Sequence, residues 1–409
     1  MEIRKGLGLQ ALPSMTLLRE LTDQIVLDTV FEQAPVTRAE IAQHTGISKT
    51  TVSEAVRRLE AAGLLLPAGE QRGRQGRVGT YYKVAPTAGF VVAVDLNPTQ
   101  IRVCAADLFG QPFLESSHVP VRPREPALVA GQLRDLVGQA VAEGAPGHGR
   151  PLAVAVSVAN PVDPVTSRVV TLPDTPYPEG LFQPQEALDG TVDAPVLVEN
   201  DVNLAALAER WHGAARTADS FAYVYVGAGM GMGLVIGDQL IRGARGVAGE
   251  IGYLSVSTQP PGPRHGRHGF ARAVAAAGFH PPREPGSDQV AIDVARQIFD
   301  RASKGDAEAR AVVEQEGRTI GEAIAAVCAV VDPELVLLGG PIGLHPALLE
   351  PVRATVQDLA PLTPAIEVGT LGDTAVLRGA LALALRRARA DLWAGAGRRP
   401  YEAPGRVAQ

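Results

Sequence analysis

Residues 227–256 read GAGMGMGLVIGDQLIRGARGVAGEIGYLSV, a glycine-rich turn followed by an apolar segment. The run Ser220 to Val226 in front of it is rich in aromatic and β-branched residues, as buried strands are. Gly233 to Ile236 predicts a strand that returns, and the glycines between the two runs suit a tight turn. This part of the chain therefore predicts a β-hairpin.

A second segment with the same organisation lies nearer the start of the chain. Phe90 to Leu96 predicts a buried strand, a turn follows, and Gln100 to Asp107 predicts the strand that returns. Each hairpin precedes a further series of strand-like and helix-like stretches. Two copies of a hairpin-led α/β unit predict two lobes around a cleft.

Composition excludes several classes of protein. The chain has 409 residues, of which 46% are hydrophobic and 20% charged, so it can form the packed cores of two or three domains. Its only cysteines, Cys104 and Cys328, exclude a disulfide scaffold and a cysteine-rich zinc cluster. The longest apolar run, Ala323 to Val331, is too short to cross a bilayer, and the first twenty residues lack a signal-peptide core. We expect a cytoplasmic protein without membrane contact.

Residues 1–86 predict a separate, mostly helical module. Apolar residues recur at helical spacing from Thr16 to Gln33. Thr37 begins a capping box for a second helix, Gly46 breaks the chain, and Ser48 can cap a third helix. The order helix, glycine-containing turn, helix is that of a helix-turn-helix motif, whose last helix enters the major groove of DNA.

The charge of this module supports that interpretation. The full chain carries a net charge of −6, whereas residues 47–84 hold 7 Lys or Arg and 3 Asp or Glu, a net charge of +4. A Gly/Arg-rich turn followed by Thr80 to Val84 predicts a two-stranded wing that reaches the minor groove. The residues that we expect to contact DNA are Ser48, Lys49, Thr50, Thr51, Ser53, Arg57, Arg72, Arg74 and Arg77. The exposed face of the third helix also carries Glu54 and Arg58. A three-helix protein-interaction module with a solvated basic face is the alternative.

Three motifs in the larger part of the chain resemble those of the ROK family, whose members are sugar kinases and transcriptional repressors. Along the chain they are VENDVNLAALAE at 198–209, the quoted residues 227–256 and DPELVLLGGPIG at 332–343, which is the order that the family has. The resemblance covers roughly residues 89–390, and a winged helix ahead of it is similar to the arrangement of the repressor branch. It implies an actin-like, two-lobed ATPase fold of the sugar kinase and Hsp70 type, dimeric or tetrameric, with sugar in the cleft.

We therefore expect an α/β protein with a winged helix-turn-helix domain at residues 1–86 and a two-lobed ROK-type domain at 89–395. The first lobe is expected at about 89–205 with a C-terminal helix at about 373–395, and the second lobe at about 206–372. Residues 396–409 are rich in Gly, Pro and Arg and predict a flexible tail.

In a kinase of this family two glycine-rich hairpins would hold the phosphates of ATP. The glycines at alternating positions from Gly227 to Gly233 could offer backbone N–H groups, although a tight hairpin needs the same glycines. The family's first hairpin reads Asp-x-Gly-Gly-Thr-Lys, but residues 95–100 read Asp-Leu-Asn-Pro-Thr-Gln. Pro98 has no N–H to donate. We therefore expect ATP not to be a cofactor and the protein not to be an enzyme.

The resemblance also implies a sugar site. In the family the Asp of a Glu-Asn-Asp run takes the proton from the sugar hydroxyl; the match, Asp201, would here be a vestigial base, and it could equally cap the helix that follows. The polar residues that we expect to bind a sugar or sugar-phosphate effector are Asn160, Asn200, Asp201, Glu250 and Tyr253.

The zinc site of the family is altered in this chain. The family's zinc-binding His corresponds to Tyr253, and the segment that should supply cysteines, about 263–272, contains His265 and His268 but no Cys. Since zinc needs about four nitrogen or sulfur ligands, we expect no metal site. Arg272, which replaces a sugar-binding Glu of the family, would favour an acidic or phosphorylated ligand.

Together these features predict a DNA-binding transcriptional regulator, a repressor of carbohydrate-related genes, whose large domain assembles a homodimer or homotetramer and senses a sugar. Two winged helices related by a two-fold axis would bind a palindromic double-stranded DNA operator. Two alternatives stay open. One is an ATP-dependent sugar kinase with a regulatory DNA-binding module, and the other is an oligomerisation scaffold that binds no ligand.

Overall fold

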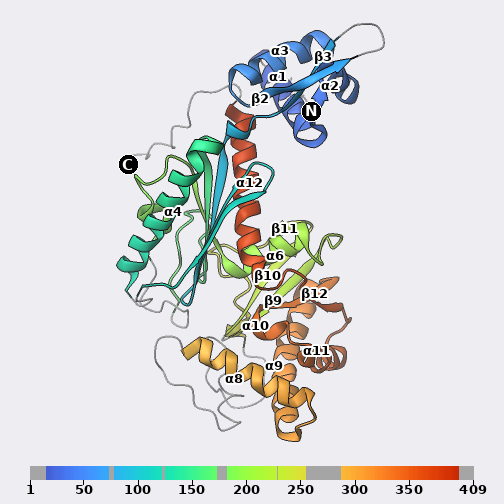
Figure 1. Ribbon diagram of the computed structural model, residues 1–409. Coiled ribbons are helices and arrows are strands. Elements are labelled where there is room, and N and C mark those ends of the chain that lie inside the picture. Colours follow the sequence, from blue (N-terminus) through green and yellow to red (C-terminus); the bar gives the residue numbers. More distant parts are fainter. Residues whose placement is uncertain are drawn as a thin grey trace, which may run out of the picture.

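The protein consists of a small N-terminal module and two α/β lobes that follow one another in space (Figure 1). The computed structural model describes residues 15–72, 78–121, 125–172, 182–227, 229–254 and 287–395. None of the helices in these ranges combines the length and the hydropathy that crossing a bilayer requires. The expected tail at 396–409 lies outside the described residues.

The N-terminal module contains three helices and a three-stranded antiparallel sheet of order β1-β3-β2. Its elements are α1 (Met15–Gln33), β1 (Val36–Thr37), α2 (Arg38–Thr45), α3 (Lys49–Ala61), β2 (Leu65–Arg72) and β3 (Val78–Val84). The capping box is present, because Thr37 N–H donates to Glu40 Oε2 (2.8 Å) and Glu40 N–H to Thr37 Oγ1 (3.3 Å). The predicted helices and wing are confirmed, and β1 is an additional strand that pairs with β3.

The first lobe contains a mixed sheet of order β6-β5-β4-β7-β8. Its strands are β4 (Phe90–Leu96), β5 (Ile101–Asp107), β6 (Pro112–His118), β7 (Pro151–Val158) and β8 (Val196–Asn200). All of β4 is buried because helices cover both faces of the sheet. Val92 and Val94 belong to the core under α4 (Pro126–His148), whereas Val91 and Ala93 belong to the core under α12 (Ala375–Gly395).

The second lobe contains a sheet of order β11-β10-β9-β12-β13. Its strands are β9 (Phe221–Val226), β10 (Met230–Ile236), β11 (Gln239–Leu240), β12 (Leu335–Gly339) and β13 (Ala365–Val368). One face packs on α6 (Asp201–His212). The elements α8 (Ser287–Ser303), α9 (Ala307–Val331), α10 (Gly340–Gly343) and α11 (Pro346–Leu359) contribute to the core on the other face.

Helix α12 connects all three parts of the molecule (Figure 1). It packs on α6, on β4 and β7, and at its C-terminal end on α1. A Cβ atom on Gly379 would collide with the carbonyl oxygen of Leu204, so only glycine lets α12 approach α6 this closely. At the junction with α1, the Arg389 guanidinium lies 5.3 Å from the ring centroid of Phe31.

Candidate DNA-binding face and ligand cleft

The start of α3 uses its hydroxyl groups to stabilise the helix. The side chain of Ser48 accepts a hydrogen bond from Thr51 N–H (3.2 Å), and the two hydroxyl oxygens lie 2.8 Å apart. The hydroxyl of Ser53 donates to the carbonyl of Lys49 at 2.8 Å. Three of the predicted DNA contacts, Ser48, Thr51 and Ser53, therefore already have partners within the helix.

The exposed stripe of α3 consists of Thr50, Glu54 and Arg57, with Lys49 beside it at the helix start. The three stripe positions follow the spacing i, i+4 and i+7, so they lie on one side of the helix. Opposite them Val52, Val56 and Leu59 are buried, as predicted. The face thus presents two cations, a hydroxyl and a carboxylate, a combination that suits phosphate and base edges.

Arg58 does not belong to this exposed face, which corrects the sequence-based expectation. Its Nε and Nη2 atoms donate to the two carboxylate oxygens of Asp23 at 2.9 and 2.6 Å, and the Asp23 side chain is only 2% exposed. This two-point contact fixes α3 on α1. Arg58 therefore orients the third helix, with its Nε and Nη2 atoms already engaged by Asp23.

The wing carries the remaining predicted contacts. The backbone of Arg72 ends β2, but its side chain, and the whole of Arg74 and Arg77 in the tip at 73–77, lie outside the described residues. What the structure describes is the base of the wing, where Tyr82 of β3 is buried and the Arg38 guanidinium lies 5.0 Å from its ring centroid.

A cavity of about 410 Å³ lies between the two lobes. Its polar wall includes Asp95 and the turn that follows it, Asn200 and Asp201 between β8 and α6, and Glu250 and Tyr253 from the second lobe. Four of the five predicted ligand-binding residues therefore line the same cavity. The fifth, Asn160, is fully buried. Its backbone carbonyl oxygen accepts a hydrogen bond from Asn200 Nδ2 at 3.2 Å.

The Glu-Asn-Asp run places Asp201 toward the cavity and gives the other two residues structural contacts. Asn200 caps α6, because its Oδ1 accepts from the N–H groups of Val202 (3.0 Å) and Asn203 (3.1 Å). Glu199 is buried and pairs with Arg242 of the second lobe at 2.6 Å. The helix cap is thus Asn200, and Asp201 is the first helical residue, whose Oδ1 also accepts from Val202 N–H at 2.8 Å. An acidic side chain here therefore stabilises the helix start as well as lining the cavity.

Three carboxyl groups share this cavity, and their pKa values rise together. Burial, as the largest cause, and the negative charges of Asp95 and Glu250 together raise the pKa of Asp201 to about 7. Burial also raises the pKa of Asp95 and of Glu250. Because Asp201 exchanges its proton near neutral pH, its carboxyl group can both donate to and accept from hydroxyl groups, which suits a polyhydroxylated ligand.

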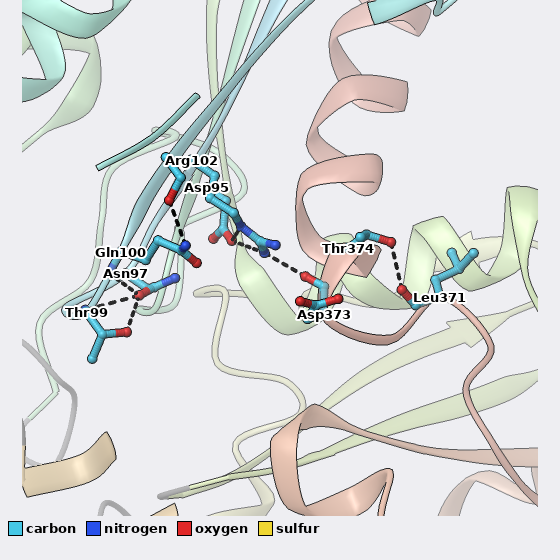
Figure 2. A network of polar contacts seen from close by, with 9 residues as sticks. Asp95, Asn97, Thr99, Gln100, Arg102, Leu371, Asp373 and Thr374 are labelled. Carbon is cyan, nitrogen blue, oxygen red and sulfur yellow. Dashed lines mark hydrogen bonds and ion pairs between the residues drawn. The ribbon is translucent and has the colours of Figure 1, made fainter. Parts of the chain in front are cut away.

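Arg102, a residue that we did not single out from the sequence, holds Asp95 in place (Figure 2). Its Nε and Nη2 atoms lie 3.1 and 2.6 Å from Asp95 Oδ2. The same Nη2 atom donates to the carbonyl of Asp373 at 2.6 Å, in the 3₁₀ turn (Gly372–Thr374) that precedes α12. The hairpin register could have revealed the pair, because Asp95 and Arg102 are directly opposite one another in β4 and β5.

The turn between β4 and β5 uses its own N–H groups internally (Figure 2). Asn97 Oδ1 accepts from the N–H groups of Thr99 (3.1 Å) and Gln100 (2.9 Å), and Asn97 N–H donates to the carbonyl of Gln100. Pro98 has no N–H. This turn therefore has no backbone donor left for a phosphate group.

The second glycine-rich turn is shorter than the sequence suggested. β10 begins at Met230, so Gly231 and Gly233 pair with β9 as strand residues. A Cβ atom on Gly233 would collide with Ala206 and with the carbonyl of Val202, so this glycine permits the contact between β10 and α6. Gly233 therefore has a packing role that the sequence alone does not reveal.

The region that would carry the family's zinc ligands, with His265, His268 and Arg272, lies outside the described residues. Within the described ranges, no group of three or more His, Cys, Asp or Glu side chains is placed to hold a metal ion.

Comparison with known proteins extends these observations. Residues 91–387 match the model of the ROK family and residues 25–75 that of the MarR family. The xylose repressor of Caldicellulosiruptor bescii is 24% identical over 388 residues, 90% of this chain and 96% of the repressor.

Two solved structures have a similar fold. A ROK family transcriptional regulator, a homologue of the Escherichia coli MLC protein, gives a TM-score of 0.71 at 18% identity, covering 93% of this chain and 99% of that one. A ROK hexokinase from Thermus thermophilus gives a TM-score of 0.57 at 27% identity, covering 75% of this chain and all of that one. The chain therefore belongs to the ROK family and carries a MarR-type winged helix at its N-terminus.

Proposed function

We propose that this protein is a sugar-responsive transcriptional repressor. The observation that carries the proposal is the exposed stripe Thr50, Glu54 and Arg57 on the third helix of a winged helix that is joined to a ROK domain. A xylose repressor that matches over 96% of its own length supports it. The α3 helix enters the major groove, and two copies of the chain bind the two halves of a palindromic operator.

The effector in this proposal is a sugar bound in the 410 Å³ cavity. Asn200, Asp201, Glu250 and Tyr253 supply the polar groups, and the carboxyl groups bind the sugar hydroxyls. Because the cavity lies between the lobes, a sugar that binds both walls changes the angle between them. Arg102 and α12 then transmit this change toward α1, so the sugar favours an arrangement that misplaces the two α3 helices.

Phosphoryl transfer is not part of this function. Transfer depends on positioned phosphates and on charge stabilisation, whereas the first hairpin has no free N–H and Asp95 is held by Arg102. We propose that the protein uses neither ATP nor zinc. The second candidate, a sugar kinase with a DNA-binding module, is favoured by Asp201 and by the hexokinase with 27% identity.

The experiment selects DNA from a random duplex pool with the full chain and then measures affinity for the selected sequence against salt. Affinity should fall by about 10³–10⁵ between 50 and 200 mM salt if six to ten phosphates are contacted. A chain that selects no sequence, or whose affinity ignores salt, contradicts the proposal.

A panel of pentoses, hexoses and their phosphates is then added to the DNA complex. One of them should release the DNA, and Glu250→Gln should abolish release while the affinity for DNA stays within twofold. If no sugar acts, the large domain is an oligomerisation scaffold. Rapid sugar-dependent release of ADP from ATP would favour the kinase.

A further inference from the structure

A second cavity lies beside α12 on the first lobe. It has a volume of about 870 Å³ and is bounded by β5, β6, the end of α6 and one side of α12. It exists because α12 packs mainly on β4 and β7, which leaves β5 and β6 at the edge of the sheet less covered on that face. We call this cavity the α12 groove, and Arg102 lines both it and the cleft.

The α12 groove has an apolar wall of the kind that binds small molecules. Leu377, Leu381 and Leu385 line it, and their spacing of four residues places them in one row along the helix. Trp211, at the end of α6, adds an aromatic face. The volume lies within the range of about 300–1,000 Å³ that is usual for small-molecule sites and is smaller than a folded partner would need.

The rest of the lining is strongly cationic. The basic residues of the groove are Arg102, His212, Arg378, Arg386 and Arg389, and among the described lining residues Glu115 is the only acidic one. The pKa of His212 is lowered by burial first and then by the positive charges of Arg378 and Arg216. His212 is therefore mainly neutral, and the anion preference of the groove comes from its arginines.

Two of these arginines, Arg378 and Arg386, are exposed where α12 lines the groove, and Arg386 is held in orientation. Arg386 lies over the indole of Trp211, 5.1 Å from the ring centroid, which restricts the orientation of its guanidinium. Arg378 lies eight residues earlier on the helix and is exposed at the groove. Planar guanidinium groups bind phosphate oxygens in pairs, so two of them suit a phosphoryl group.

We propose that the α12 groove is a second ligand site, which binds an organic phosphate with its phosphoryl group between Arg378 and Arg386. The apolar or ring-shaped part of the ligand lies against Trp211 and the leucine row. This site is separate from the sugar cleft.

The groove also adjoins the junction with the DNA-binding module. Arg389 lines the groove, donates to the carbonyl of Leu108 at 2.7 Å, and lies over the ring of Phe31 in α1. Phe109, which follows Leu108 in the chain, contacts Phe31 with ring centroids 5.2 Å apart. A ligand in the groove therefore touches Arg389, whose guanidinium packs on α1. Through this contact the ligand alters the affinity for DNA, an effect that rests on the proposed function.

The test uses the fluorescence of Trp211 in the full chain carrying Trp393→Phe, which removes the only other tryptophan. Glucose 6-phosphate, AMP and inorganic phosphate are the probes, and calorimetry on the native chain supplies an independent affinity. We expect a saturable change with one of the organic phosphates, at least tenfold weaker in Arg378→Gln/Arg386→Gln. Arg387→Gln is the matched control, because Arg387 pairs with Asp391 on the same helix and does not line the groove.

Each other outcome overturns a defined part of the proposal. No response to any probe, or an unchanged affinity in the double variant, removes the site. Loss of the response in Asp201→Asn would place the ligand in the sugar cleft instead. Binding that leaves DNA affinity unchanged overturns the coupling alone, and a chain that binds the phosphate but no DNA overturns the proposed function while the site stands.

Discussion

The guanidinium of Arg102 donates to the carbonyl oxygen of Asp373 at 2.6 Å, although the two residues are 271 positions apart in the sequence. Because Arg102 also holds Asp95, this single side chain ties the first hairpin to the segment that leads into α12. The cleft, the turn that precedes α12 and the α12 groove therefore meet at Arg102.

Replacing Arg102 should weaken the contacts at the cleft, at the turn before α12 and at the α12 groove. In Arg102→Gln the buried Asp95 loses its main partner, and because burial already raises its pKa, the carboxyl group takes up a proton. We expect a loss of roughly 1–3 kcal/mol of stability and faster hydrogen exchange at residues 372–374. Arg168→Gln is the matched control, because it breaks an exposed ion pair with Glu186 in the same lobe. Equal effects of the two substitutions on melting temperature would contradict the assignment.

Arg57 should contribute to DNA affinity through charge. In Arg57→Gln we expect weaker binding and a slope of log affinity against log salt that is smaller by about 1, the value for one lost phosphate contact. Arg310→Gln removes the same charge from the exposed surface of α9 and should leave the slope unchanged. Fluorescence anisotropy with the selected duplex measures the salt slope of each variant. Equal slopes for Arg57→Gln and Arg310→Gln would count against DNA binding by the exposed face of α3.

Arg58 should matter for folding of the module. Arg58→Ala leaves the buried Asp23 carboxylate unpaired, so we expect a loss of about 1–3 kcal/mol and faster exchange of the α3 amides. Asp23→Ala/Arg58→Ala should lose less than the sum of the single losses, since the two residues act as a pair. Strict additivity in hydrogen-exchange mass spectrometry would show that the contact is unimportant.

Asp201 should give stability a pH dependence. Because its pKa is raised from 3.8 to about 7, the folded state keeps a proton that the unfolded chain loses above pH 4, and stability falls as pH rises through this window. In the parent this decrease in the free energy of unfolding is up to about 1.4 kcal/mol per pH unit, and Asp201→Asn should abolish it. Its melting temperature should therefore exceed that of the parent at pH 8, with little difference at pH 4.

The exposed Asp189→Asn serves as the control for loss of a carboxylate and should follow the parent at both pH values. If Asp201→Asn also follows the parent at pH 8, the carboxyl group ionises normally in the cleft.

Local features were predictable from the sequence because they depend on neighbouring residues. The caps at Thr37 and Ser48 and the strands β4 and β5 follow from short-range hydrogen bonding and from hydrophobic pattern. The two-lobed architecture and four of the five residues of the polar cluster in the cleft followed from motif resemblance, which the family match supports.

Contacts between distant segments were not predictable in this way. Arg58 has the sequence position of a DNA contact, and only the packing of α1 brings Asp23 to it. Gly233 was expected to begin a strand and to offer an N–H to phosphate, but the pattern did not show that α6 lies so close to β10 that no side chain fits there. The α12 groove combines residues from four separate elements, and no local pattern marks it.

The position of α12 has a consequence for synthesis of the protein on the ribosome. The module at the start of the chain contacts a helix formed by residues 375–395, so a nascent chain can fold its winged helix early but can seat it only after those residues have emerged. A chain that stops before α12 would keep the contact between Phe31 and Phe109 but lose the helix on which α1 packs. Nonsense mutations late in the gene should therefore release regulation as completely as early ones do.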